Sequence, residues 1–163
     1  MLCVNIPFCF ADKAANSSLK LIPLGDVPLD QLEEYDTKIH TINRRGHLEE
    51  FRNLEHAYAA VTNDKQLLGY GCLRPFLDEM YKLGPVLADD ANTADVLISS
   101  LVKQLPDDKE VMILYYDENS RAIRNMKEPV EPQVHVEFLY TKYPVQVPVE
   151  KVFCLANALN SFA

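Results

Sequence analysis

The sequence predicts an α/β (α+β) fold with a mixed, mostly antiparallel sheet flanked by helices. Three observations lead to this prediction: short β-rich segments recur along the chain, amphipathic helical segments separate several of them, and a short turn joins two of them into a hairpin. The 163 residues suffice for a domain with its own core, and 48% hydrophobic and 25% charged residues are typical of a globule. We expect a poorly ordered leader over residues 1–18 and a single domain over 19–163.

The first half of that domain predicts a strand, two helices and a hairpin. Asp26 is the expected cap of the first helix, which begins near Pro28 and carries its apolar residues on one face. Asn63, Asp64 and Lys65 form the turn signal of the hairpin. The predicted spans are 19–24 for the strand, 28–35 and 41–54 for the helices, and 56–62 and 66–74 for the hairpin strands.

Residues 80–105 organise the rest of the predicted fold. In the apolar strand MYKLGPVLA (80–88), Gly84 and Pro85 predict a bulge. Apolar residues then recur at three- and four-residue steps, which predicts a helix with a cap among Asp89, Asp90, Asn92 and Thr93. A bulged strand leaves backbone groups unpaired, and a helix start offers free N–H groups to an anion. Together they suit an extended ligand that ends in a phosphate.

The last third of the chain predicts shorter elements between prolines. EVMILYY (110–116) has the composition of a buried strand, and DENSRAIRNM (117–126) has weak helical character. Short strands follow near VHVEFLY and VEKVFCLA. The predicted order is a strand, two helices, three antiparallel strands, a helix, a strand, a helix and terminal strands.

Charge and hydropathy exclude several classes of function. A net charge of −8 argues against a nucleic-acid partner and against an anionic membrane surface. No apolar run approaches the roughly 18–20 residues that span a bilayer. The first residues carry no Lys or Arg, and Asn5 and Pro7 interrupt the apolar run, which disfavours a secretory signal. We therefore expect a cytoplasmic protein.

Cysteine and histidine spacing gives no sign of a metal site. The four cysteines include no close pair, and the four histidines are scattered along the chain. Cys72 and Cys154 lie in strand-like segments, where a small buried apolar residue is the simplest interpretation. We expect no metal.

The predicted order of elements is also that of the GNAT acyltransferase fold. The chain resembles the C-terminal GNAT-type domain of YitH-like acetyltransferases over residues of about 20 to 160. The most specific part is GYG-LRP followed by LGP-LADD. The matching blocks are LEEYDTKIHTINRR (32–45), LLGYGCLRP (67–75), YKLGPVLADDANTADVLISSL (81–101), DENSRA (117–122) and KVFCLANAL (151–159).

The resemblance implies that acetyl-CoA binds as cosubstrate. In GNAT proteins the pantetheine arm lies along the bulged strand as though it were another strand, and the helix start holds the pyrophosphate. Asn119 would lie beside the thiol end, although its side chain could equally be an N-cap. The implied cofactor-binding residues are Val86, Leu87, Ala88, Asp90, Ala91, Asn92, Thr93, Ala94, Asp95, Asn119 and Ala122.

The pyrophosphate turn departs from the usual family pattern. Most GNAT proteins have Arg or Gln, two residues, Gly, one residue, then Gly or Ala, whereas this chain has Asp89, Asn92 and Ala94 at those positions. A carboxylate near a diphosphate is unfavourable by about 1 kcal/mol at an exposed site. We therefore expect weak CoA binding through backbone N–H groups and a nearby base such as Lys103 or Arg121.

Catalysis would need a base, because an ammonium has no lone pair with which to attack a thioester. The candidates are Glu79 and Tyr81 near the bulged strand, and Asp36. A solvated turn also explains Glu79. The tyrosine that often protonates the leaving thiolate in this fold has no counterpart in AIRNMKE, and Tyr140 is the nearest later tyrosine.

Substrate contacts are implied for three further residues. Tyr35 and Arg44, with Asp36, match family positions in a helical lid over the acceptor cleft, and Arg74 ends a strand facing the same region. The four residues could instead form an internal set of ion pairs and hydrogen bonds. Both interpretations stay open on the sequence alone.

Two functions follow. The first is an N-acetyltransferase that moves an acetyl group from acetyl-CoA to a small amine by direct transfer. The alternative is a catalytically degenerate GNAT-fold binding or dimerisation module that still binds CoA, favoured by the missing tyrosine and the altered phosphate turn. Because YitH-like proteins usually carry another GNAT-type domain, a homodimer could replace that neighbour here.

Overall fold

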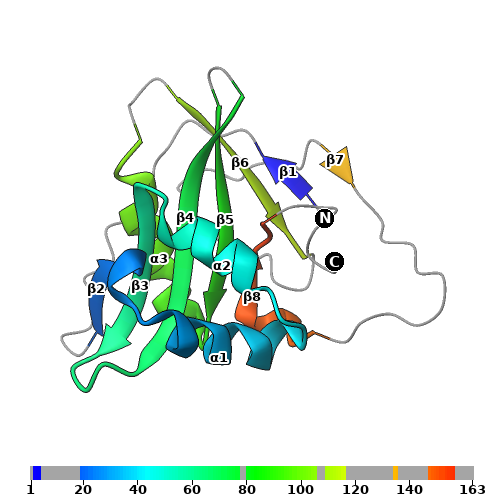
Figure 1. Ribbon diagram of the computed structural model, residues 1–163. Coiled ribbons are helices and arrows are strands. Elements are labelled where there is room, and N and C mark those ends of the chain that lie inside the picture. The colour runs from blue at the N-terminus through cyan, green and yellow to red at the C-terminus, as the bar shows by residue number, and fades with distance from the viewer. Residues whose placement is uncertain are drawn as a thin grey trace, which may run out of the picture.

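The strands form one mixed sheet. The computed structural model describes residues 2–4, 19–77, 80–105, 109–116, 134–135 and 147–156. The order in the sheet is β2-β3-β4-β5-β6-β1-β7, and β8 pairs with β5 (Figure 1). Among the described strands, only β5 and β6 pair in parallel, which confirms the predicted fold class. The strands are β1 (Leu2–Val4), β2 (Leu19–Pro23), β3 (His56–Thr62), β4 (Leu67–Leu77), β5 (Met80–Ala88), β6 (Glu110–Tyr115), β7 (Val134–His135) and β8 (Val152–Cys154).

Helices cover both faces of this sheet. In Figure 1, α1 and α2 lie in front of the strands and α3 lies behind them. The described helices are α1 (Leu29–His40), α2 (Arg45–Arg52) and α3 (Ala91–Val102), with the short 3-10 helices η1 (Leu24–Asp26) and η3 (Val149–Lys151).

Strand alternation divides the core between the two faces. Ala57, Ala59 and Val61 of β3 pack with α1 and α2, whereas Ala60 packs with α3. Leu87 of β5 likewise belongs to the first cluster and its neighbour Val86 to the second. Successive side chains of a strand point to opposite faces, so one strand serves both clusters. We call them the α1 face and the α3 face.

The start of α1 differs from the prediction. Pro28 occupies the N-cap without a side-chain hydrogen bond, so the predicted Asp26 cap is wrong. Asp26 instead ends η1, which separates it from the first turn of α1. The helix continues to His40, where Thr41 in the left-handed conformation (φ 57°) ends it. The second helix is shorter than predicted because it begins only at Arg45.

The hairpin and the central strand–helix unit follow the sequence closely. β3 and β4 pair antiparallel across the predicted turn. β5 has the predicted bounds, and its register with β4 shifts around Gly84 and Pro85, as expected for a bulge. Asp90, one of the predicted caps, accepts a hydrogen bond from the Thr93 amide at 2.8 Å. These local signals therefore predicted the centre of the molecule correctly.

The predicted leader and C-terminal helix are described only in part. Leu2–Val4 of the leader pairs with both β6 and β7, and the other leader residues lie outside the described residues. The helix predicted at 117–126 also lies outside them. Within the part of the chain that the structure describes, no helix has the length and apolar character needed to cross a membrane.

Candidate functional site

β5 and β6 form a fork at the centre of the sheet. They pair in parallel from Met80 and Glu110 to Leu83 and Ile113, where their pairing ends. β5 then continues to Ala88 and runs directly into the turn before α3. The bulge in β5 begins at the vertex of the fork. This is the strand-to-helix arrangement for which the sequence predicted an extended ligand.

The chain's own strand β8 lies in the fork. Val86 pairs with Cys154, and Leu87 pairs with Val152, both antiparallel. On the other side of the fork, the Leu155 N–H donates to the carbonyl oxygen of Leu114 on β6 at 2.7 Å. Since β4 pairs with the opposite edge of β5, Val86 and Leu87 have a strand on both sides. The backbone edge expected to be open for a ligand is therefore paired in this structure.

A glycine permits β8 to approach the vertex closely. A Cβ atom placed on Gly84 would lie 2.4 Å from the Leu155 carbonyl oxygen, well inside van der Waals contact. Gly84 also has φ +135°, a region that residues with side chains rarely adopt. Only glycine satisfies both requirements at this position.

β8 is held by core burial and by contacts at both ends. Lys151 pairs with Asp89 at 3.0 Å, and Arg74 donates to the carbonyl oxygen of Ala156. The side chains of Val152, Phe153 and Leu155 are at most 2% exposed. Burying three such side chains contributes about 5–9 kcal/mol as an upper estimate. β8 is therefore a firmly packed part of the domain.

Two carboxylates, those of Asp89 and Asp90, lie directly before α3. Ala94 donates to the Asp90 carbonyl oxygen, so the amides of residues 91–93 precede the helical ladder. The Asp90 side chain already accepts from the Thr93 amide, while Asp90, Ala91 and Asn92 are exposed. An incoming phosphate would compete with this carboxylate for the helix N-terminus. Of the other residues predicted here, Ala94 and Asp95 are buried.

Lys151 is a cation at this turn that the sequence did not reveal. It pairs with Asp89, the residue that the resemblance aligns with the Arg or Gln of most GNAT proteins. The two residues are 62 positions apart, so no local pattern could have linked them.

Tyr35 connects α1 to the same turn. Its hydroxyl donates to the Leu68 carbonyl oxygen at 3.0 Å and lies 3.5 Å from the Asp89 carboxylate. Burial, together with the charge of Asp89, raises the pKa of Tyr35 well above its usual value. The phenol is thus a neutral donor that fixes α1 against β4 and the turn that follows β5.

Asp36 and Arg44 form a buried ion pair under α1. Arg44 donates to Asp36 through Nε at 3.0 Å and Nη2 at 2.6 Å, and Tyr70 donates at 2.6 Å. Burial alone would lower the pKa of Arg44, but its contacts with Asp36 and Tyr70 raise it overall. Asp36, predicted as a base, is fully buried and already accepts three hydrogen bonds. In this structure Asp36 and Arg44 therefore form an internal ion pair, which is one of the two interpretations that the sequence left open.

The remaining predicted residues are distributed around the fork. Tyr81 is half-buried on β5, two residues before pairing with β6 ends. Arg74 lies on β4 and binds the end of β8. Glu79, Asn119 and Ala122 lie outside the described residues.

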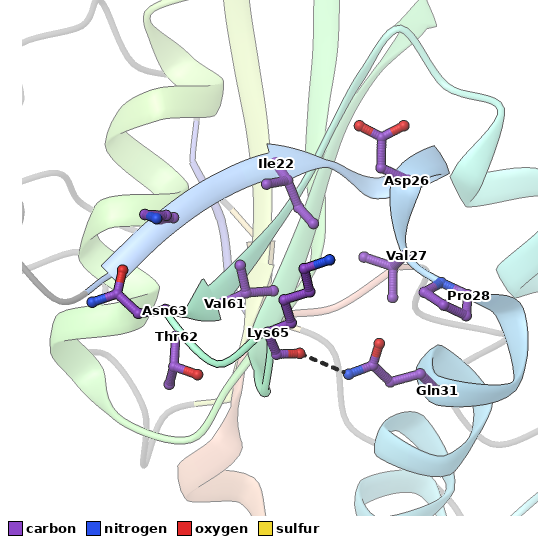
Figure 2. Close-up of a pocket in the computed structure, with 10 residues that line it drawn as sticks. Ile22, Asp26, Val27, Pro28, Gln31, Val61, Thr62, Asn63 and Lys65 are labelled. Carbon is purple, nitrogen blue, oxygen red and sulfur yellow. Dashed lines mark hydrogen bonds between the residues drawn. The ribbon is translucent and has the colours of Figure 1, made fainter.

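A separate pocket opens at the β2 edge of the sheet (Figure 2). Its volume is about 300 Å³, and its walls include Ile22, Val27 and Val61. The Gln31 amide donates to the Lys65 carbonyl oxygen at 3.0 Å and joins α1 to the hairpin turn. None of the predicted site residues lines this pocket. It is therefore distinct from the fork, which lies at the centre of the sheet.

Comparisons with known proteins agree with this architecture. A crystal structure of a candidate acetyltransferase from Pyrococcus horikoshii superposes with a TM-score of 0.57 at 14% sequence identity. The match covers 95% of this chain and 50% of that one, so the chain spans about half the length of that protein. No match was found among curated proteins. The family model described as Acetyltransferase (GNAT) domain matches residues 32–137, more than half of the chain. The chain therefore belongs to the GNAT acetyltransferase domain family.

Proposed function

We propose that this chain is a GNAT-type N-acetyltransferase that moves an acetyl group from acetyl-CoA to a small amine by direct transfer. The observation that carries the proposal is the fork, in which β5 leaves β6 and continues straight into a capped helix. The resemblance to YitH-like C-terminal domains implies that this gap receives the pantetheine arm. The same resemblance directs the pyrophosphate to the start of α3.

The cofactor would use backbone rather than side chains. The pantetheine arm would pair with Val86, Leu87 and Ala88, and the diphosphate would approach the amides of residues 91–93, which precede the helical ladder. Lys151 pairs with Asp89 in this structure, so the acidic turn is partly neutralised before the cofactor binds. Asn119 and Ala122 stay proposed contacts at the thiol end.

The transfer forms an amide bond and breaks a thioester bond. The amine nitrogen attacks the acetyl carbonyl carbon after a base has taken its proton, and the departing CoA thiolate gains a proton. Tyr81 and Glu79 are the proposed proton carriers, and Tyr81 lies on β5 two residues before the vertex of the fork. Asp36 is less suited, since its carboxylate already accepts hydrogen bonds from Arg44 and Tyr70.

A thiol-release assay tests this function. The chain is incubated with millimolar acetyl-CoA and a panel of amines, including polyamines, and free CoA is followed against a blank without amine. We expect amine-dependent release and at least a tenfold lower kcat for Tyr81→Phe. Tyr58→Phe, on β3 against the α3 face, is the matched control and should behave as wild type. Absence of release with every amine, in protein that binds CoA, would contradict turnover.

The second candidate is a GNAT-fold module that binds CoA or a second copy of the chain without turnover. The position of β8 in the fork argues against turnover in this conformation, because the proposed cofactor edge is already paired. Calorimetric heat with CoA but no thiol release would support this module. The homodimer and the cytoplasmic location stay predictions.

A further inference from the structure

We propose that β8 is a built-in competitor of acyl-CoA, which must leave the fork before the pantetheine arm can bind. The inference rests on the proposed function, since it takes the fork as the cofactor slot. It adds that the chain controls its own cofactor affinity through residues 149–156.

Backbone pairing makes the two occupants mutually exclusive. β4 uses one edge of β5 at Val86 and Leu87, and β8 uses the other. A pantetheine arm lying as an added strand needs the amide and carbonyl groups that Val152 and Cys154 now pair with. Each edge of a strand can pair with only one neighbouring strand at a time.

Packing leaves no room for both occupants. The Leu155 carbonyl oxygen stands where even a single carbon atom on Gly84 would clash. Phe153 and Cys154 belong to the core of the α3 face, and Val152 and Leu155 belong to that of the α1 face. The fork is thus filled by both the backbone and the side chains of β8.

The end contacts place the competitor over the whole proposed cofactor path. Lys151, on η3, reaches Asp89 at the phosphate turn, and Ala156 meets Arg74 beyond the vertex. Moving β8 out therefore breaks these two end contacts, its pairing with β5 and the hydrogen bond from Leu155 to Leu114, besides exposing its core residues. CoA affinity should rise in any variant that weakens these contacts without unfolding the domain.

The first experiment compares two core substitutions by calorimetry with CoA. Phe153→Ala weakens the docking of β8, and Leu101→Ala makes a cavity in the same cluster on α3. We expect Phe153→Ala to bind CoA at least tenfold more tightly than wild type, and Leu101→Ala to bind as wild type does. Circular dichroism confirms that both variants are folded. Equal tightening by both variants would overturn the proposal, because general loosening would then be the cause.

The second experiment locks β8 in place and does not depend on a destabilised variant. Val86 and Cys154 are cross-strand partners, so Val86→Cys offers Cys154 a disulfide partner that diamide can oxidise. We expect CoA binding to vanish on oxidation and to return with dithiothreitol. The same variant carrying Cys154→Ser cannot form this lock and should show no such change.

The outcomes separate this inference from the proposed function. Equal CoA binding by the oxidised and reduced forms of Val86→Cys would overturn the proposal that β8 competes with acyl-CoA, and would leave the proposal of acyl-CoA binding intact. A folded Phe153→Ala variant that binds no CoA, like a wild type that binds none, would contradict the cofactor slot itself. In wild type with saturating CoA, hydrogen exchange of residues 152–155 should accelerate. Unchanged exchange in a protein that demonstrably binds CoA would overturn the competitor independently.

Discussion

On the α1 face of the sheet, buried charged and phenolic side chains contact one another, whereas on the α3 face the contacts are mostly between aliphatic side chains. Asp36, Arg44 and Tyr70 are each at most 4% exposed, and Arg44 and Tyr70 both bind Asp36. The α3 face instead packs residues such as Leu97 and Leu101 against β4 and β5. Buried charges are tolerated only in one paired geometry, whereas aliphatic packing is less directional. The α1 face therefore fixes the position of its helices, and the α3 face contributes mainly apolar area.

The largest effect is expected from breaking the buried ion pair. Asp36→Ala should lower the free energy of unfolding by about 3–5 kcal/mol in urea denaturation, because it leaves the Arg44 charge buried and unpaired. The double variant Asp36→Leu with Arg44→Met should recover most of that loss, since neither charge remains. A loss near zero for the single variant would mean that the pair is not desolvated in solution.

A cavity made on the α3 face should lower the free energy of unfolding by a comparable amount, but for a different physical reason. Leu97→Ala should lower the free energy of unfolding by about 2–5 kcal/mol in the same urea denaturation experiment, because it removes apolar contacts and leaves a cavity. Recovery of Leu97→Ala by any single polar change would contradict the aliphatic description.

The third change removes one donor from the polar network. Tyr70→Phe deletes the hydroxyl that donates to Asp36 at 2.6 Å and leaves the ring in place. A hydrogen bond to a charged group is worth about 1.5–3 kcal/mol, which is the expected loss of stability. If Tyr70→Phe cost as much as Asp36→Ala, the phenol rather than Arg44 would be the main partner of Asp36.

A pH titration sharpens the comparison. Both ring nitrogens of His40 are buried without a hydrogen-bond partner among the described residues. Burial, with the nearby Arg44 charge, lowers the pKa of His40 to about 4 from its usual value of 6.5. The unfolded chain therefore binds the proton more readily, and wild-type stability should fall as pH drops from 6.5 towards 4. Between pH 7 and 5 we expect a loss of about 1–2 kcal/mol that is absent in His40→Leu. If wild type and His40→Leu lost the same stability between pH 7 and 5, titratable groups other than His40 would be the cause.

The smallest effect belongs to the exposed charges of the same helices. Arg45 pairs with Asp30 at 2.9 Å and with Glu33, but its side chain is 44% exposed. Arg45→Ala should leave the urea midpoint close to that of wild type, because water screens an exposed pair. A large shift would show that burial is not what distinguishes the Asp36–Arg44 pair.

Local patterns predicted the central elements because their signals lie within a few residues of one another. The bounds of β5, its bulge and the Asp90 cap of α3 all follow from adjacent side chains. The Asp26 cap was wrong because the sequence did not reveal η1, which holds Asp26 away from the helix. For Asp36 and Arg44, the sequence identified the partners but could not decide between a lid and an internal pair. In the structure both side chains are buried under α1 and bind each other, which is the internal pair.

By itself, the sequence determined the family, the mixed sheet and the strand–helix unit that could receive a cofactor. The sheet and the strand–helix unit follow from hydrophobic periodicity and turn residues, which are local, and the family follows from the resemblance of the sequence motifs to those of GNAT proteins. Only the tertiary structure decided what lies beside β5, because Val86 and Cys154 meet across 68 residues of chain. Such pairing is set by which strand best fills the fork and satisfies its backbone groups, and no spacing in the sequence encodes that competition.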